Sequence, residues 1–80
     1  MDNQETALRE TVVYISGRKI QGYPTVTFNV TFTTVDDLIK KIDFLIEGTD
    51  YGKVDVLIEG EELFTEEEVK KLEDEWILFA

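Results

Sequence analysis

Two residue types with central roles in protein chemistry, cysteine and histidine, are absent from this chain of 80 residues. Without cysteine, disulfide bonds and thiolate chemistry are excluded. Zinc sites need Cys or His in nearly every common arrangement, and general acid–base catalysis uses His most often. A carboxylate-only enzyme is the alternative, but a chain this short leaves little room for a substrate cleft. We therefore expect a protein that is not an enzyme and that uses neither a cofactor nor a metal.

Long apolar segments are also lacking, and no run approaches the roughly 18 residues that a membrane-spanning helix needs. The first ten residues, MDNQETALRE, have neither the basic nor the apolar region of a signal peptide. We expect a cytoplasmic protein without membrane contact, in the host cytoplasm if a phage encodes it. The hydrophobic fraction of 42% is sufficient for a core. Residues 1–7 are polar and aperiodic, which predicts a flexible tail before a single α+β domain at residues 8–80.

Positive charge is scarce, and its scarcity is confined to one half of the chain. The net charge is −10, from 18 acidic and 8 basic residues. Residues 1–42 carry five acidic and five basic residues, whereas residues 43–80 carry thirteen acidic and three basic ones, so the whole excess lies in the second half. This asymmetry creates a directional field that attracts basic partners and repels DNA, RNA and anionic membranes.

Three segments have the pattern of β-strands. Residues 25–33 alternate strictly, with four apolar side chains on one face and Thr or Asn on the other. Residues 11–16 (TVVYIS) are apolar on both faces, which is typical of a central strand. Residues 53–59 (KVDVLIE) have an apolar inner face and a mostly acidic outer face. Glycines and Pro24 at residues 17–24 predict a turn between the first two strands.

Two amphipathic helices complete the pattern. The first is expected at residues 35–47, with Thr34 as its N-cap and Gly48 after its C-terminus. The second begins at Thr65, because Thr65 and Glu68 have the spacing of a capping box. Its continuation through residues 76–80, with Trp76 in the core, is favoured, and the alternative is that the last residues leave the helix as a short strand. Its predicted buried stripe consists of Val69, Leu72, Trp76 and Ala80.

The order strand, strand, helix, strand, helix predicts a three-stranded antiparallel sheet with two helices packed on one face. The simplest topology places the first strand between the other two. The first helix then connects the outer strands by a right-handed split β-α-β crossover. The opposite face of the sheet, with the Thr and Asn side chains of residues 25–33, stays open to solvent.

The acidic end is the first candidate binding surface. Helix-dipole effects and the i, i+4 pairs Glu66–Lys70 and Glu67–Lys71 explain some of its carboxylates. The remaining excess destabilises the fold by self-repulsion, so a surface that only improves solubility is one interpretation and a binding surface is the other. The expected partner-binding residues are Glu59, Glu61, Glu62, Glu66, Glu67, Asp74 and Glu75.

A basic protein, such as a nuclease or another nucleic-acid-binding protein, would be the partner of this surface. Carboxylates would stand where phosphates lie in its nucleic-acid groove, and the chain itself would not bind nucleic acid. Phages and plasmids use small acidic inhibitors in this way against restriction enzymes, DNA glycosylases and CRISPR nucleases. The chain resembles that functional class in size and charge, and no residue motif ties it to a family. We therefore expect an inhibitor of the anti-restriction or anti-CRISPR type, and an immunity protein or antitoxin against a basic toxin has the same physics.

The second candidate surface is the edge of the strand at residues 25–33. Exposed edges pair with partner strands or with a second copy, which would make the chain an adaptor module or a homodimer. The contact residues would be Thr25, Thr27, Asn29 and Thr31, although such residues are also common on ordinary solvated sheet faces. Calcium binding is not expected, because DYGKVD at residues 50–55 does not match an EF-hand loop.

Overall fold

The computed structural model describes residues 8–17 and 24–80. The elements in chain order are β1 (Arg9–Gly17), β2 (Val26–Phe32), α1 (Val35–Thr49), β3 (Val54–Ile58), the 3-10 helix η2 (Glu61–Leu63), α2 (Glu66–Asp74) and β4 (Ile77–Phe79). The tail expected at residues 1–7 and most of the turn expected after β1 lie outside the described residues. The α+β class and the two α-helices agree with the prediction.

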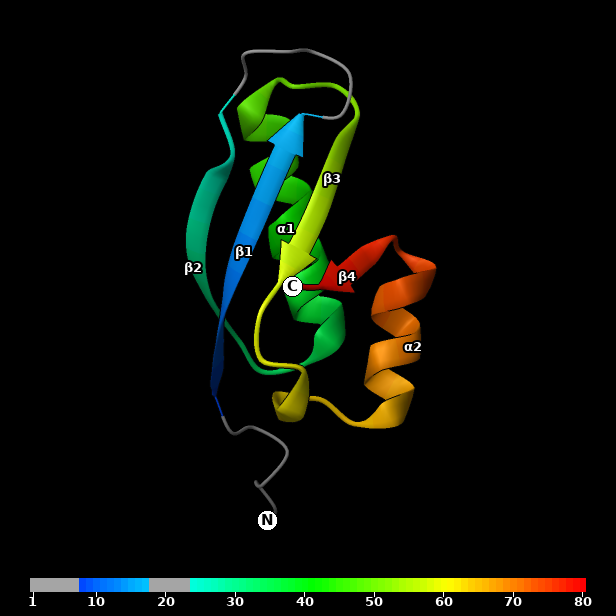
Figure 1. Cartoon of the computed structure of the whole chain (residues 1–80). Coiled ribbons are helices and arrows are strands. Elements are labelled where there is room, and N and C mark those ends of the chain that lie inside the picture. Colours follow the sequence, from blue (N-terminus) through cyan, green and yellow to red (C-terminus); the bar gives the residue numbers. More distant parts are fainter. Residues whose placement is uncertain (1–7, 18–23) are drawn as a thin grey trace.

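The sheet has four strands in the spatial order β2-β1-β3-β4 (Figure 1). β1 pairs antiparallel with both β2 and β3, which confirms that the first strand lies between the next two. β4 pairs parallel with β3. The prediction of a three-stranded antiparallel sheet is therefore wrong, because the last residues of the chain add a fourth strand and make the sheet mixed.

The C-terminal segment is the source of this error. α2 ends at Asp74, and Trp76 adopts a left-handed backbone conformation with φ 64°. Ile77 then pairs with Val56 of β3, and Phe79 pairs with Ile58. The predicted helix through residues 76–80 is therefore wrong. Pairing with β3 gives the backbone N–H and C=O groups of this segment hydrogen-bond partners, and it buries Ile77. Both effects favour the short strand over another helical turn.

Trp76 does not belong to the core, contrary to the prediction. Its side chain is 80% exposed, because the turn after α2 carries it away from the apolar stripe. Leu72 is the one fully buried residue of α2. The aromatic packing expected at this end comes instead from Phe64, whose ring stacks on Phe32 with 5.6 Å between centroids.

The helix caps follow the sequence closely at the N-termini. The Thr34 hydroxyl accepts a hydrogen bond from the backbone N–H of Asp37, and Thr65 and Glu68 form the complete capping box. At the C-terminus of α1 the prediction is wrong, because the helix continues through Gly48 to Thr49, and its C-cap is Asp50, the residue in the left-handed conformation (φ 58°). Aspartate tolerates that conformation better than most residues do.

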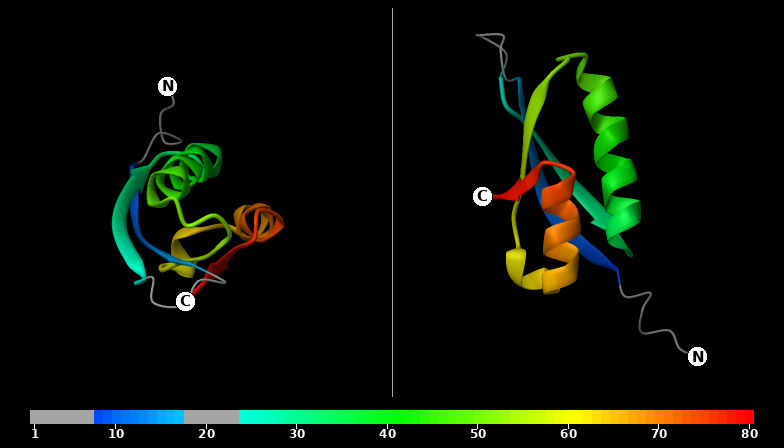
Figure 2. Two further views of the ribbon diagram at one scale, coloured as in Figure 1. Left: turned by 90° about the horizontal axis from the view of Figure 1, so that it is seen from above. Right: turned by 90° about the vertical axis from the view of Figure 1, so that its right-hand side faces the viewer.

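Both helices lie on the concave face of the curved sheet (Figure 2). The core between these layers consists of Val13, Ile15, Val30, Phe32, Val35, Leu38, Ile42, Val56, Ile58, Phe64, Leu72 and Ile77. These residues come from every strand and from both helices, so the acidic C-terminal half is packed into the same core as the neutral first half.

Arg9, at the start of β1, joins the two halves of the chain. Its guanidinium donates to both carboxylate oxygens of Glu68 in α2, at 3.0 and 3.2 Å. It also donates to the backbone carbonyls of Thr33 and Leu63. The same group lies 4.9 Å from the centre of the Phe32 ring, within range of a cation–π interaction. One side chain thereby fixes α2 and the preceding turn against the sheet.

Candidate functional site

The main acidic surface is built from a short segment, residues 59–67, at the end of β3. Gly60 has φ 90°, a conformation that favours glycine, and turns the chain out of the sheet. η2 and the capped start of α2 follow directly (Figure 1). The five predicted residues of this segment, Glu59, Glu61, Glu62, Glu66 and Glu67, all have exposed side chains. Local turn geometry thus gathers them at one end of the molecule.

Two basic residues near this surface neutralise carboxylates within the fold, whereas Lys70 lies beside Glu61 and Glu66 without an ion pair in the described part of the chain. Arg9 pairs with Glu68, and the Lys71 ammonium lies 2.9 Å from a carboxylate oxygen of Asp36 on α1. The predicted pairing of Lys71 with Glu67 does not occur. Among the described residues, no Lys or Arg forms an ion pair with any of the five exposed glutamates. Their charge is therefore left to solvent or to a partner.

The pKa values reflect which side chains have an ion-pair or hydrogen-bond partner within the fold. The hydrogen bond from Arg9 lowers the pKa of the Glu68 carboxyl, and burial opposes that shift. The hydrogen bond from Lys71 lowers the pKa of Asp36 and raises that of Lys71. The Tyr14 hydroxyl donates to the Glu59 carboxylate, and this bond raises the pKa of Tyr14. Glu59 is thus the one member of the exposed group that a neighbouring side chain orients.

A hollow of about 410 Å³ lies beside Glu59. Glu10, Glu59 and Glu62 contribute carboxylates to its lining, and Leu63 and Val12 contribute apolar surface. Among the described residues, no cluster of three or more potential metal ligands is close enough to hold an ion. The spacing of carboxylates around an apolar wall is instead suited to the stem and charged head of a Lys or Arg side chain.

Asp74 and Glu75 form a second, smaller acidic group. They lie at the opposite end of α2, and the nine residues of that helix span about 13 Å at 1.5 Å per residue. The seven predicted carboxylates therefore form two groups rather than one. Trp76 follows Glu75 directly and is highly exposed. It was predicted to lie in the core, because the apolar run of residues 76–79 contains no polar residue to mark the end of the helix.

Three of the four predicted edge residues, Thr27, Asn29 and Thr31, lie in an edge strand, and Thr25 directly precedes it. β2 is the first strand of the sheet, and Thr25, Thr27, Asn29 and Thr31 have exposed side chains. The carbonyl of Val12, opposite Asn29, accepts a hydrogen bond from the Glu59 N–H on the β3 side. By the antiparallel pattern, the backbone groups of Asn29 and of Thr27 then point to the free edge. This geometry makes them available for strand pairing.

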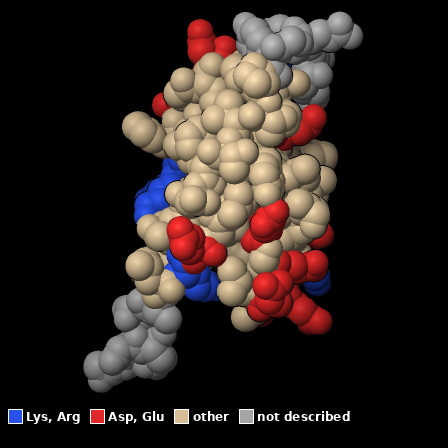
Figure 3. Space-filling view, turned by 60° about the vertical axis from the view of Figure 1, so that its left-hand side comes forward, with Lys and Arg blue, Asp and Glu red and all other residues tan. Residues whose placement is uncertain are grey.

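The open face of the sheet carries few charges at its centre (Figure 3). Tyr14, Leu57 and Leu78 lie in register across β1, β3 and β4 on this face. Leu57 and Leu78 are 37% and 49% exposed. In the same view most acidic side chains gather in the lower half of the molecule, with basic side chains beside them (Figure 3). Asp55 and Glu59 flank Leu57 on the same face of β3, so the open face combines apolar and acidic side chains.

No helix among the described residues has the length and apolar character needed to cross a membrane. In comparisons with known proteins, no family model matches the chain, and no curated protein or solved structure matches it either.

Proposed function

We propose that this chain is a small, non-enzymatic inhibitor that binds a basic, nucleic-acid-handling protein through its acidic end. One observation carries the proposal: the five glutamates of residues 59–67 are exposed and form no ion pair with a Lys or Arg of residues 8–17 and 24–80, while nearby Arg9 and Lys71 are used inside the fold. A fold that could pair these carboxylates with its own cations leaves them uncompensated. A basic partner supplies the missing charge.

The mechanism is competition for cationic side chains. Lys and Arg in a nucleic-acid groove form charge-assisted hydrogen bonds with carboxylates as they do with phosphates. Binding also releases condensed counterions, so the affinity of such a complex falls as salt rises. An inhibitor of a restriction enzyme or a CRISPR nuclease would act in this way, and an immunity protein or antitoxin against a basic toxin would use the same surface.

Trp76 gives the second acidic group an apolar contact. Tryptophan is enriched among the residues that dominate binding energy at protein interfaces. Asp74 and Glu75 precede it directly, and its exposed ring could stack on an arginine of the partner. We therefore include Trp76 with Asp74 and Glu75 in the proposed binding surface.

The test is a pair of charge-reversed variants captured against host lysate, with the retained proteins identified by mass spectrometry. The variant Glu61→Lys/Glu62→Lys alters the proposed surface, and Asp43→Lys/Glu47→Lys makes the same change of net charge on exposed positions of α1. We expect the wild type and the α1 variant to retain one basic partner at low salt. The Glu61→Lys/Glu62→Lys variant should lose it.

Purified partner then gives the dissociation constant at several salt concentrations. We expect the affinity to fall at least tenfold between 50 and 200 mM salt, as for interfaces with several charge contacts (about 10³-fold for six or more). Equal binding by both variants, or an affinity that does not change with salt, would refute the acidic mechanism. The second outcome would favour the adaptor function, for which the free backbone groups of β2 are the supporting observation.

A further inference from the structure

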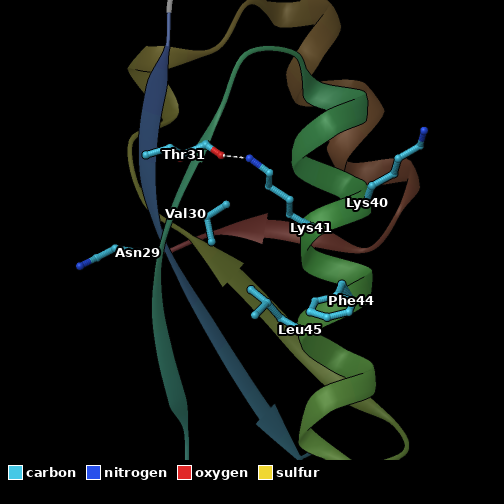
Figure 4. Close-up of a pocket in the computed structure, with 7 residues that line it drawn as sticks. All are labelled: Asn29, Val30, Thr31, Lys40, Lys41, Phe44 and Leu45. Atoms are coloured by element: carbon cyan, nitrogen blue, oxygen red, sulfur yellow. Dashed lines mark hydrogen bonds between the residues drawn. The ribbon is translucent and has the colours of Figure 1, made fainter.

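A groove runs between the free edge of β2 and α1, on the side of the molecule away from α2 (Figure 4). Its volume is about 390 Å³. Val30 of β2 and Leu45 of α1 point into it, and Phe44 forms part of its wall. The Phe44 side chain is 75% exposed, so its ring leaves a large apolar area in contact with water although the rest of the helix is well packed. The groove therefore offers apolar surface that the fold itself does not cover.

The free edge supplies backbone hydrogen-bonding groups along the same groove. The ends of this edge are already occupied, because Lys41 Nζ donates to the Thr31 carbonyl at 2.6 Å and the Tyr51 hydroxyl donates to the Pro24 carbonyl at 2.9 Å. Between them, Thr27 and Asn29 direct their N–H and C=O groups outward. Strand β2 has none of the usual protection of an edge, since no proline or charged residue interrupts its seven residues.

The charge of the groove is opposite to that of the whole protein. Lys40 and Lys41 are among its lining residues, and no carboxylate is. The Lys41 ammonium has three donors, and its contacts with Thr31 and with Asp37 leave it able to bind a further acceptor at the upper end of the groove. In a chain of net charge −10, this is a local site for a negatively charged group.

We propose that the groove binds an extended segment of another protein, which adds a fifth strand to the sheet beside β2. Backbone pairing with Thr27 and Asn29 would hold the segment, as in other cases of strand addition. Because side chains alternate along a strand, every second residue of the segment would face α1. We assign an apolar residue to the position over Val30, Phe44 and Leu45, and an Asp or Glu to the position next to Lys41.

A second copy of this chain fits the groove less well. A two-fold contact through β2 would place the edge strand of each copy along the groove of the other. It would supply no carboxylate from the edge strand, whose seven residues VTFNVTF carry no charge. The charge complementarity therefore favours a different, acidic segment, and this inference does not depend on the proposed function of the acidic end.

The probe is a library of random ten-residue peptides displayed on phage and selected on the full-length protein. We expect the selected peptides to share apolar residues at alternate positions and at least one Asp or Glu. A synthetic peptide of that sequence should slow hydrogen exchange of the Thr27 and Asn29 amides. Its affinity should fall at least tenfold for Phe44→Ala and for Lys41→Glu.

Two matched variants serve as controls. Trp76→Ala removes a similarly exposed aromatic ring, and Lys70→Glu makes the same charge change on α2. Both should bind the peptide as the wild type does. The inference is overturned if no sequence is enriched, or if the peptides bind Phe44→Ala and Lys41→Glu as tightly as the wild type. It is also overturned if the protein forms a dimer in sedimentation that Phe44→Ala disrupts, because the occupant would then be a second copy.

Discussion

Replacement of Arg9 by methionine should destabilise the fold strongly, although the residue lies outside the hydrophobic core. The change keeps most of the apolar stem against Phe32 and removes the guanidinium. It leaves the Glu68 carboxylate without its cation, and the carbonyls of Thr33 and Leu63 without their donor. The Arg9 and Glu68 side chains are 23% and 25% exposed, so the pair is neither buried nor fully solvated.

The expected cost follows from that intermediate burial. Breaking a fully buried ion pair costs about 3–5 kcal/mol, and a fully exposed pair contributes about 0–1 kcal/mol. We therefore expect Arg9→Met to lower the free energy of unfolding by about 2–3 kcal/mol, through the loss of charge-assisted hydrogen bonds. For a chain of this size, that loss lowers the melting temperature by about 10–20 °C. Urea unfolding followed by circular dichroism measures the change in the free energy of unfolding.

A matched control and the pH dependence test the reasoning. Lys41→Met breaks an exposed i, i+4 pair with Asp37 and an exposed hydrogen bond to the Thr31 carbonyl, and should cost about 1 kcal/mol or less. Arg9 lowers the pKa of Glu68 in the folded state, so its stabilising effect is present above the ordinary glutamate pKa of about 4.3. It is lost as the pH falls through the lower, folded-state value. A cost for Arg9→Met equal to that of the control, or independent of pH down to that range, would refute this account.

Further predictions concern the turns and the acidic residues. Gly60→Ala should lower the free energy of unfolding by about 1–2 kcal/mol, because φ is 90° and the new Cβ would lie 2.9 Å from Leu63 Cδ1. The control is Gly52→Ala, whose new Cβ meets open space, and it should cost less in the same urea assay. Trp76→Gly should raise stability by about 0.5–1 kcal/mol, since it relieves a left-handed backbone at little cost in burial; an equal decrease would show that the ring packs. Lys71→Ala should return the Asp36 pKa upward to its ordinary range, as followed by carboxyl NMR titration, and an unchanged pKa would contradict the ion pair.

Local patterns predicted the elements whose cause is local. The strict alternation of β2, the N-cap of α1 and the capping box of α2 depend on residues within a few positions of one another, and they were predicted correctly. β4 could not be predicted with the same certainty, because three residues do not define a period and the strand depends on pairing with β3, about 20 positions away. Trp76 was misplaced as a consequence.

For the candidate site too, local properties could be predicted from the sequence, whereas the arrangement of the residues in space could not. The exposure of the acidic residues followed from their chemistry, but their division into two groups depends on the turn at Gly60 and on the direction of α2. The β2–α1 groove was not predicted. Phe44 lies off the apolar stripe of its helix, and only the packing of α1 against β2 decides what surrounds it.

The Arg9–Glu68 pair also determines how the chain unfolds in time. It joins residues 59 positions apart, and contacts across so long a loop form late because loop closure costs chain entropy. Interactions that are absent from the folding transition state change the unfolding rate rather than the folding rate. A loss of about 2–3 kcal/mol would therefore accelerate unfolding by about 30- to 150-fold, at 1.4 kcal/mol for each factor of ten. Arg9 thus acts as a latch that sets the lifetime of the folded chain.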